Sequence, residues 1–392
     1  MEAGHTNLKI AQVIDVFENA INGGGISTQR FTKLLRQQGH RVILIANGEE
    51  ATDKVALRSY YPPIPFTKRI LKRMKFVFAK PDEAKMERVF SEVDIVHNQF
   101  PLWLGAATVR IANQLGKPLV STFHVQGEQI MYNSGLTHPF WTKLIYRYFV
   151  KHIYNKSDIV ICPSKFAEQE IKRYGVTRPT VVISNGVTPD YRKIDIPKRY
   201  PGKFTILTVG RNAAEKRQEM LIRAIADSKY KDKIQLIILG DGPQRHALEK
   251  LSHELLNGTT EFKLVPQEKV IEYYNSVDLY VHSAAIEVEC MTALEAMACG
   301  LPLLIADSVL SATKQFALGE KFLFKTQAEL TKKIDYFFTN SAELIQAAEQ
   351  YLELSKQYSI ERSYQKLTDT YYKALKMHEI TVPAQHTVLE EA

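Results

Sequence analysis

The chain has 392 residues, more than one hydrophobic core usually supports, so we expect two domains. Its 45% hydrophobic and 24% charged residues are typical of a globular protein, and no apolar run reaches the roughly 18 residues of a membrane-spanning helix. The net charge of +8 favours anionic partners. The first residues lack the pattern of a secretory signal, and the three cysteines lack metal-ligand spacing. We therefore expect a cytoplasmic protein without a disulfide framework.

Short apolar runs alternate with segments of helical period in the first half of the chain. Residues 8–15 are predicted to form the first strand, three glycines follow, and 26–38 has the pattern of a helix. Further strands are predicted at 41–46, 94–97, 118–122, 158–162 and 180–184. This alternation indicates a parallel α/β sheet.

A polar stretch with prolines, 188–203, separates this series from a second one. The strands predicted in the second series are 204–209, 234–239, 278–281 and 301–305. Two doubly wound α/β units in tandem follow from this pattern. The segment 341–377 has helical periodicity.

Two strand-to-helix turns have features of anion sites. Gly23–Gly25 would let the backbone approach a phosphate, although the run is not GxGxxG and does not support a nicotinamide site. A plain tight turn is the alternative. Arg211 and Lys216 follow the strand 204–209, where they could bind a diphosphate. The alternative there is an exposed basic turn paired with Glu215.

The segment 287–302 carries the most specific pattern. Glu287 and Glu295 are eight positions apart, and an A-x-A-x-G-x-P run follows from Ala296 to Pro302. A carboxylate in a loop before a helix can accept hydrogen bonds from sugar hydroxyls, and one two turns later can hold a ribose diol. This segment resembles the retaining glycosyltransferases of family 4, which have the GT-B fold.

Other motifs of that family occur in the expected order. Gly24 and Gly25 match its phosphate-approaching glycines, and Thr122-x-His124 matches a motif whose histidine lies beside the donor sugar. Arg211 and Lys216 match the basic pair that stabilises the departing nucleoside diphosphate. Gly242 belongs to a G-x-G-P turn near the base. The resemblance therefore implies donor binding by Gly24, Gly25, Arg211, Lys216, Gly242, Glu287 and Glu295, and catalysis by His124, Glu287, Arg211 and Lys216.

One loop departs from the family pattern. The family usually has Phe-Gly where this chain has Glu289 and Cys290. The cysteine bears on the loop geometry and the donor sugar, and Glu289 could compete for the role of Glu287. No D-x-D pair occurs at a strand end, so we expect no metal site and no cofactor.

The resemblance implies two Rossmann-like doubly wound domains that face each other across a donor-binding cleft. We expect an acceptor domain at 1–190, a nucleotide-sugar domain at 200–360, a helix at 361–380 that crosses back to the first domain, and a disordered tail at 381–392. It also implies a hexosyltransferase that retains the anomeric configuration without a metal, with UDP-glucose as co-substrate.

Two basic, partly aromatic segments are candidates for acceptor or membrane contacts. Residues 66–80 hold Lys68, Arg69, Lys72 and Arg73 among apolar residues at helical spacing, and a second segment begins near Trp141. They could also pack on the sheet with solvated basic edges. The family includes bacterial diacylglycerol glucosyltransferases, so we expect a lipid acceptor and peripheral contact with the anionic inner face of the membrane.

Three alternatives differ in class or acceptor. The same enzyme could act on a capsule or exopolysaccharide glycan. The positive charge alone would also suit a nucleic-acid-binding protein, but no reader motif supports one, so we expect no nucleic-acid partner. A catalytically silent homologue would have no chemical need for Glu287, Glu295, Arg211 and Lys216 together.

Overall fold

The structure is a computed structural model that describes residues 7–18, 23–62, 68, 71–72, 76–134 and 138–381, with side chains up to 378. It divides into two compact units. The first comprises the described parts of Met1–Gly127, Thr137–Ser184 and Ser363–Ala392, and the second comprises those of Glu128–Leu136 and Asn185–Arg362. The expected disordered tail lies outside the described residues, apart from position 381. No described helix is long and apolar enough to span a bilayer.

The first unit is built on a parallel seven-stranded sheet with the order β3-β2-β1-β6-β7-β8-β9. Its strands are β1 Lys9–Val13, β2 Arg41–Asn47, β3 Lys54–Leu57, β6 Ile95–Asn98, β7 Leu119–Thr122, β8 Ile159–Cys162 and β9 Thr180–Val182. Ile10 of β1 is in register with Val42 and with Ile95 on either side. The central strands β6, β7 and β8 are buried along their whole lengths, and β8 is apolar throughout, as expected for a parallel sheet covered on both faces.

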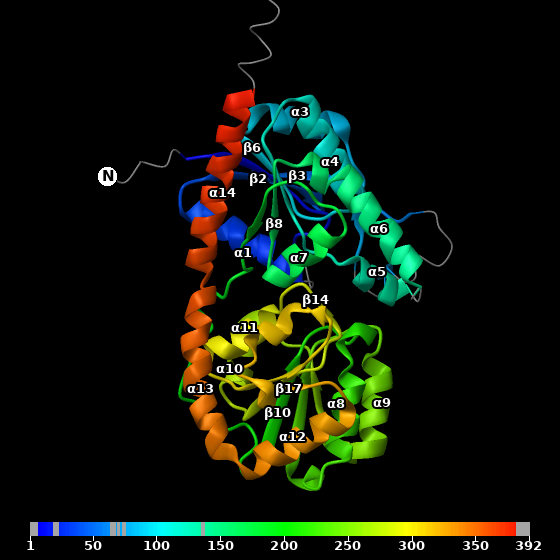
Figure 1. Cartoon of the computed structure of the whole chain (residues 1–392), viewed down its shortest axis with the longest axis vertical. Coiled ribbons are helices and arrows are strands. Elements are labelled where there is room, and N and C mark those ends of the chain that lie inside the picture. The colour runs from blue at the N-terminus through cyan, green and yellow to red at the C-terminus, as the bar shows by residue number, and fades with distance from the viewer. Residues whose placement is uncertain are drawn as a thin grey trace, which may run out of the picture. The chain divides into compact units, whose positions relative to one another are not determined.

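Helices cover both faces of this sheet (Figure 1). They are α1 Gly23–Gln37, α3 Glu83–Glu92, α4 Trp103–Gln114, α6 Pro139–His152, α7 Lys165–Arg173 and most of α14 Ile360–Thr381. α14 packs Leu367 and Tyr371 against Ile10 and Ile95 of the sheet. α1 begins at Gly23, so the glycines form its first turn, and the expected start at residue 26 is wrong by one turn. A short antiparallel pair, β4 Ser59–Tyr60 and β5 Phe78–Ala79, flanks the sheet.

The second unit has a parallel six-stranded sheet with the order β12-β11-β10-β13-β15-β17. Its strands are β10 Phe204–Val209, β11 Ile234–Leu239, β12 Glu261–Lys263, β13 Leu279–His282, β15 Leu303–Ala306 and β17 Leu323–Phe324. Its helices are α5 Gly127–Ser134 in all but its first residue, α8 Gln218–Ala226, α9 Arg245–Leu256, α10 Val270–Tyr274, α11 Met291–Ala298, α12 Gln327–Thr339 and α13 Ser341–Ser355. A small parallel pair, β14 Ile286–Glu287 and β16 Leu310–Ser311, lies apart from the main sheet.

Both main sheets share one topology. Counted in chain order within each sheet, the strands run 3-2-1-4-5-6, with one more strand at the end of the first sheet. The order reverses between β1 and β6 in the first unit and between β10 and β13 in the second. Open α/β sheets bind ligands outside the carboxyl ends of the strands at such a switch point. The expected fold class, two Rossmann-like parallel α/β units, is confirmed.

Candidate active site

Two glycine turns meet at the carboxyl edge of the second sheet. The amide of Asn212, just after β10, donates to the carbonyl oxygen of Asp241, just after β11, over 3.0 Å. A Cβ on Gly240 would lie 2.0 Å from the carbonyl oxygen of Gly210, and a Cβ on Gly242 would lie 2.5 Å from that of Asn212. The turns therefore approach each other too closely for any other residue. Gly242 has this packing role independently of any ligand.

The cations expected to bind a diphosphate both have internal partners. Arg211 donates from Nη2 to the buried carboxylate of Glu215 over 2.5 Å, so the ion pair considered as an alternative is present. Arg211 retains 16% side-chain exposure, which leaves part of its guanidinium able to meet a ligand. Lys216, at the end of a 3-10 turn (Ala214–Lys216), pairs with Glu287.

The Lys216–Glu287 ion pair joins the 3-10 turn that follows β10 to the end of β14. Glu287 ends β14, whose pairing with β16 fixes its backbone, and it is 12% exposed. Burial raises the pKa of Glu287, although the charge of Lys216 opposes this rise. Burial alone would lower the pKa of Lys216, but Glu287 and neighbouring acidic groups raise it. The lysine therefore stays cationic, and the pair places one positive and one negative group at the sheet edge.

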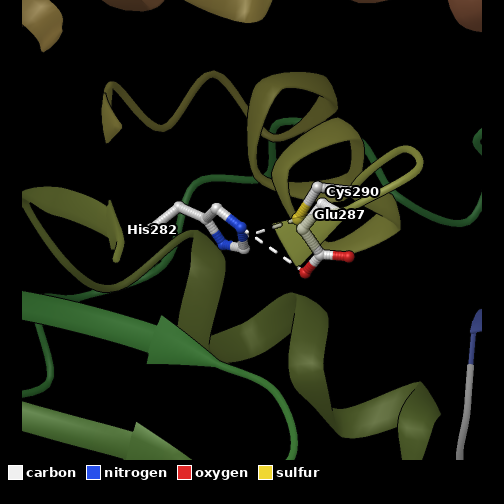
Figure 2. A group of neighbouring side chains, drawn as sticks. All are labelled: His282, Glu287 and Cys290. Atoms are coloured by element: carbon white, nitrogen blue, oxygen red, sulfur yellow. Dashed lines mark hydrogen bonds and ion pairs between the residues drawn. The ribbon is translucent and has the colours of Figure 1, made fainter. Parts of the chain in front are cut away.

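His282, Glu287 and Cys290 form a buried group beside this pair (Figure 2). His282 lies with Nε2 3.5 Å from Glu287 Oε1 and with Nδ1 3.5 Å from Cys290 Sγ. Burial raises the pKa of the Cys290 thiol to about 12. Burial, with the charges of Lys216 and Arg217, lowers the pKa of His282 well below its ordinary value. The Cys290 thiol and the His282 imidazole are therefore neutral near pH 7, and Glu287 pairs with Lys216.

This group is the candidate for a metal centre among the described residues. Its three ligand atoms lie within 4.8 Å of one another. However, the carboxylate of Glu287 is already paired with the ammonium of Lys216. The positive charge of Lys216, which also lowers the pKa of His282, would repel a metal cation bound beside it. The donor set and its surroundings fit a metal ion poorly.

Glu287 and Glu289, in the loop that differs from the family pattern, have different partners. Glu289 is buried and accepts a hydrogen bond of 2.8 Å from the amide of Asn185, whereas Glu287 pairs with Lys216. Cys290 has φ −129°, an extended conformation open to any residue. The loop therefore closes without the glycine that the family pattern has there.

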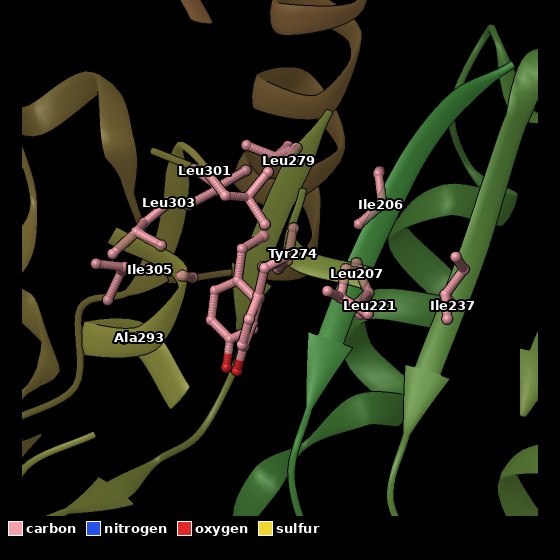
Figure 3. Close-up of a cluster of buried hydrophobic side chains, with 14 of the residues drawn as sticks. Ile206, Leu207, Leu221, Ile237, Tyr274, Leu279, Ala293, Leu301, Leu303 and Ile305 are labelled. Atoms are coloured by element: carbon pink, nitrogen blue, oxygen red, sulfur yellow. The ribbon is translucent and has the colours of Figure 1, made fainter. Parts of the chain in front are cut away.

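Glu295 lies in the core side of α11. It is 5% exposed and accepts a hydrogen bond of 3.1 Å from the hydroxyl of Tyr274. Tyr274 belongs to the core of the second unit, packed near Leu279 and Ala293 (Figure 3). The carboxylate thus has an internal donor in this structure, and a ribose diol would have to share it.

In the first unit, the glycine turn and the histidine motif lie together. A Cβ on Gly24 would be 2.7 Å from Phe100 and 3.0 Å from the His124 side chain, so a glycine is needed where α1 begins. His124 is 9% exposed, and burial lowers its pKa to about 4. It is therefore a neutral imidazole near pH 7, which can hydrogen-bond but carries no charge. Gly25 is buried next to Gly24 in the same turn.

A buried relay, not expected from the sequence, holds the strand end that carries His124. His97 makes two hydrogen bonds. Its Nδ1 lies 2.7 Å from the hydroxyl oxygen of Tyr371, and its Nε2 lies 2.7 Å from the hydroxyl oxygen of Thr122. Burial lowers the pKa of His97 to about 3, so it is also neutral. Tyr371 comes from α14, and the tyrosine therefore positions the T-x-H motif from a distant part of the chain.

Asp15 is a further candidate site residue that the sequence did not predict. It follows β1 at the switch point, is 1% exposed and accepts a hydrogen bond of 3.1 Å at Oδ1 from the amide of Ala79. Within the described residues its Oδ2 has no hydrogen-bond partner. Burial raises its pKa to about 7. Its only sequence signal is a carboxylate directly after a buried strand.

The residues expected at a membrane or acceptor surface are exposed where they are described. Trp141, in α6, has 44% exposure, and Lys68 and Lys72 are exposed. Arg69 and Arg73 lie outside the described residues.

Solved structures share this architecture. Anabaena HepE in complex with UDP and glucose superposes with a TM-score of 0.73 at 17% identity, covering 93% of this chain and 99% of that one. A sucrose-phosphate synthase from Thermosynechococcus elongatus gives 0.75 at 17% identity, covering 95% and 100%. At this identity the likeness establishes the fold alone. This fold, together with the family models that match the chain, defines a glycosyltransferase of the GT-B class.

Family models narrow this class. The model described as Glycosyltransferase Family 4 matches residues 21–191, and the one described as Glycosyl transferases group 1 matches residues 191–354. Together the two models match residues 21–354, and the chain belongs to the glycosyltransferases that they describe.

Several curated relatives match this chain over most of its length. The alpha-monoglucosyldiacylglycerol synthase of Streptococcus pneumoniae is 24% identical over 318 residues, 76% of this chain and 70% of the relative. The synthase of the same name from Acholeplasma laidlawii is 24% identical over 395 residues, 92% and 96%. A GDP-mannose-dependent alpha-mannosyltransferase of Mycolicibacterium smegmatis is 27% identical over 317 residues, 77% and 80%.

Proposed function

We propose that the protein is a retaining hexosyltransferase that moves a hexose from a nucleotide sugar, UDP-glucose, to a lipid acceptor such as diacylglycerol at the cytoplasmic face of the membrane. The observation that carries the proposal is the Lys216–Glu287 ion pair beside Arg211 at the carboxyl edge of the second sheet. It offers cations for a leaving diphosphate and a carboxylate for sugar hydroxyls at one place.

The proposed chemistry is electrostatic. The bond between the anomeric carbon and the diphosphate oxygen breaks while Lys216 and Arg211 stabilise the charge that develops on the leaving group. The acceptor oxygen attacks from the same face of the sugar, and its proton passes to the leaving diphosphate. Glu287 would hold sugar hydroxyls, and Glu295 the ribose. We propose no metal and no cofactor, in keeping with the poor fit of the His282 group to a cation.

In the first unit, His124 and Asp15 are the candidate polar partners. His124 keeps the positioning role that the family motif implies, as a neutral hydrogen-bonding group near the glycines Gly24 and Gly25. Asp15, with a buried carboxyl at the switch point, would hold a hydroxyl of the acceptor.

The lipid acceptor is supported by relatives and by one surface. Two relatives are named for glucosyldiacylglycerol synthesis. In addition, α6 exposes Phe140, Trp141 and Leu144, apolar side chains suited to a bilayer interface. Because other relatives are named as GDP-mannose-dependent mannosyltransferases, GDP-mannose is the alternative donor. A glycan acceptor remains the second candidate.

The deciding experiment measures nucleoside diphosphate release from a panel of nucleotide sugars, with and without diacylglycerol in vesicles, and identifies the anomer of the product. Release from UDP-glucose that diacylglycerol stimulates, with an α-linked product, supports the proposal. Stimulation by an oligosaccharide but not by diacylglycerol would move the acceptor to a glycan. Absence of release from every donor would indicate a silent homologue.

A further inference from the structure

The imidazole of His282 lies between a thiol and a carboxylate at the carboxyl end of β13, one of the two strands at the switch point of the second sheet. Its Nδ1 lies 3.5 Å from Sγ of Cys290 and its Nε2 3.5 Å from Oε1 of Glu287, the two contacts that are dashed in Figure 2. His282 is 3% exposed, and within the described residues its Nε2 makes no hydrogen bond. Glu287 is therefore the group that an N–H at Nε2 would meet.

The charge of Glu287 decides which ring nitrogen of His282 carries the hydrogen. The imidazole is neutral, because burial holds its pKa well below the ordinary value, so one nitrogen bears hydrogen and the other a lone pair. With the hydrogen on Nδ1, the lone pair of Nε2 would face a negative carboxylate. With the hydrogen on Nε2, the N–H faces Oε1, and Nδ1 can accept from the thiol. The second arrangement is electrostatically favourable.

A chain of polar side chains supplies the hydrogen that Nδ1 accepts. The hydroxyl of Tyr280 lies 2.7 Å from Oγ1 of Thr292, which lies 3.3 Å from Sγ of Cys290. Burial raises the pKa of Cys290 to about 12, so the sulfur keeps its hydrogen. When Tyr280 donates to Thr292 and Thr292 donates to Cys290, the thiol hydrogen is left for the imidazole, and each member donates once. Cys290 stands where the family pattern has a glycine, which offers no side chain to complete this chain.

We propose that His282 is a positioning residue for Glu287, and that Cys290 fixes the imidazole so that its Nε2–H faces the carboxylate. The inference rests on the proposed role of Glu287 in holding sugar hydroxyls. Oε1 of Glu287 also pairs with Lys216, the cation proposed to stabilise the leaving diphosphate. When the diphosphate draws on Lys216, the imidazole N–H is the donor that keeps the carboxylate in place. His282 thus acts through Glu287 rather than on the substrate itself.

Two replacements of His282 separate positioning from packing. The side-chain amide of glutamine can place an N–H where Nε2 lies, whereas that of asparagine reaches only the position of Nδ1. We expect His282→Asn to lower kcat about 10- to 100-fold, the effect of losing a hydrogen bond to a charged group, with little change in the Michaelis constant for the donor. His282→Gln should keep kcat within about fivefold of wild type. Equal losses in the two variants, or full activity of His282→Asn, would overturn the proposal.

The role of Cys290 is tested by a matched set of variants. Cys290→Ser keeps a hydrogen for Nδ1, and Cys290→Ala removes it. Cys299→Ala makes the same change in a buried cysteine at the other end of α11 and is the control. Cys290→Ala should lower kcat about tenfold, while the serine variant and the control stay within about threefold of wild type. Thermal unfolding shows that each variant is folded. A control as impaired as Cys290→Ala would contradict the proposal.

The tautomer of His282 can be measured without any turnover, by nitrogen NMR of the full chain with isotope-labelled histidine. The signal that disappears in His282→Gln identifies this residue among the 11 histidines. We expect Nε2 to resonate as a protonated nitrogen and Nδ1 as an unprotonated one, and Glu287→Gln to shift Nε2 more than Glu289→Gln does. A hydrogen on Nδ1 would overturn the proposal. This readout holds even if wild type transfers no sugar from any donor, so failure of the proposed function and failure of this inference are separate outcomes.

Discussion

The carboxylates Glu287 and Glu289 stand two residues apart and differ in their partners. Glu287 meets Lys216, and Glu289 accepts the amide of Asn185. We therefore expect Glu287→Gln to lower kcat by about 10²–10³, the scale seen when one stabilising group of a transition state is removed. The substitution also leaves the charge of Lys216 without its partner, so the free energy of unfolding should fall by about 1–3 kcal/mol. Steady-state nucleoside diphosphate release would measure this.

Glu289→Gln is the matched control for that prediction. The amide side chain can still accept from Asn185 but loses the charge of the carboxylate, so the expected loss is about 1–2 kcal/mol in the free energy of unfolding. The Michaelis constant for the donor should change little. A large loss of kcat in the Glu289 variant, with Glu287→Gln active, would reverse the roles assigned to the two residues.

Asp15 predicts a pH dependence of stability. Its pKa is raised to about 7 in the folded chain from 3.8 when unfolded, so its contribution is fully present at low pH and is lost as the pH rises through about 7. Asp15→Asn removes the buried charge. Relative to wild type, this variant should gain stability between about pH 5 and about pH 8, as measured by urea unfolding at both values.

The same substitution tests whether Asp15 contacts the acceptor. We expect Asp15→Asn to raise the Michaelis constant for the acceptor without altering that for the donor. A relative stability that does not vary with pH would mean that Asp15 is not the buried acid described here. Unchanged acceptor kinetics would limit it to a structural role.

At the scale of elements, the turns after β10 and β11 depend on backbone contact. Gly240 has φ 142°, and its missing Cβ leaves room for the carbonyl of Gly210. We expect Gly240→Ala to cost several kcal/mol in unfolding free energy and to abolish donor binding, because both strain and a steric clash oppose it.

Gly202 separates these two causes. It also has a positive φ, 80°, but nothing lies within 4 Å of its Cβ position. Gly202→Ala should therefore cost only about 1–2 kcal/mol, the penalty for a left-handed conformation. Urea unfolding of the two variants would show the difference, and equal losses would mean that the contact between the turns contributes nothing.

The elements also show what the sequence can predict. β1, β2, β10 and β11 have nearly continuous apolar runs because both of their faces are buried, and each was predicted within about two residues. β3, β12 and β17 were missed, because strands of two to four residues at or near a sheet edge are too short to show a pattern.

The site was predictable to the extent that it is local in sequence. Glu287, Arg211 and Lys216 follow from motifs at strand ends. The relay of Tyr371, His97 and Thr122 does not, because it joins residues 274 positions apart through a fold that no local pattern specifies. The partners of Glu289 and Glu295 were hidden for the same reason.

At the scale of the whole molecule, the cations behind the net charge of +8 differ in whether they have an ion-pair partner. At the proposed donor site, Lys216 and Arg211 are paired internally. By contrast, Lys143, Arg147 and Lys151 are exposed on one face of α6 and form no ion pair within the described residues. Salt should therefore weaken membrane contact more than donor chemistry, because exposed charges are screened and buried pairs much less so.

This difference gives the last prediction. Raising the salt concentration from about 0.05 M to about 0.5 M shortens the Debye length from roughly 14 Å to roughly 4 Å. Transfer to diacylglycerol in phosphatidylglycerol vesicles should fall about tenfold, while transfer to a water-soluble short-chain diacylglycerol should hold nearly constant. The Lys143→Gln, Arg147→Gln variant should have lost most of this salt dependence. If both acceptors respond equally, the salt acts on the donor site, and the cationic surface of α6 does not set the rate at the membrane.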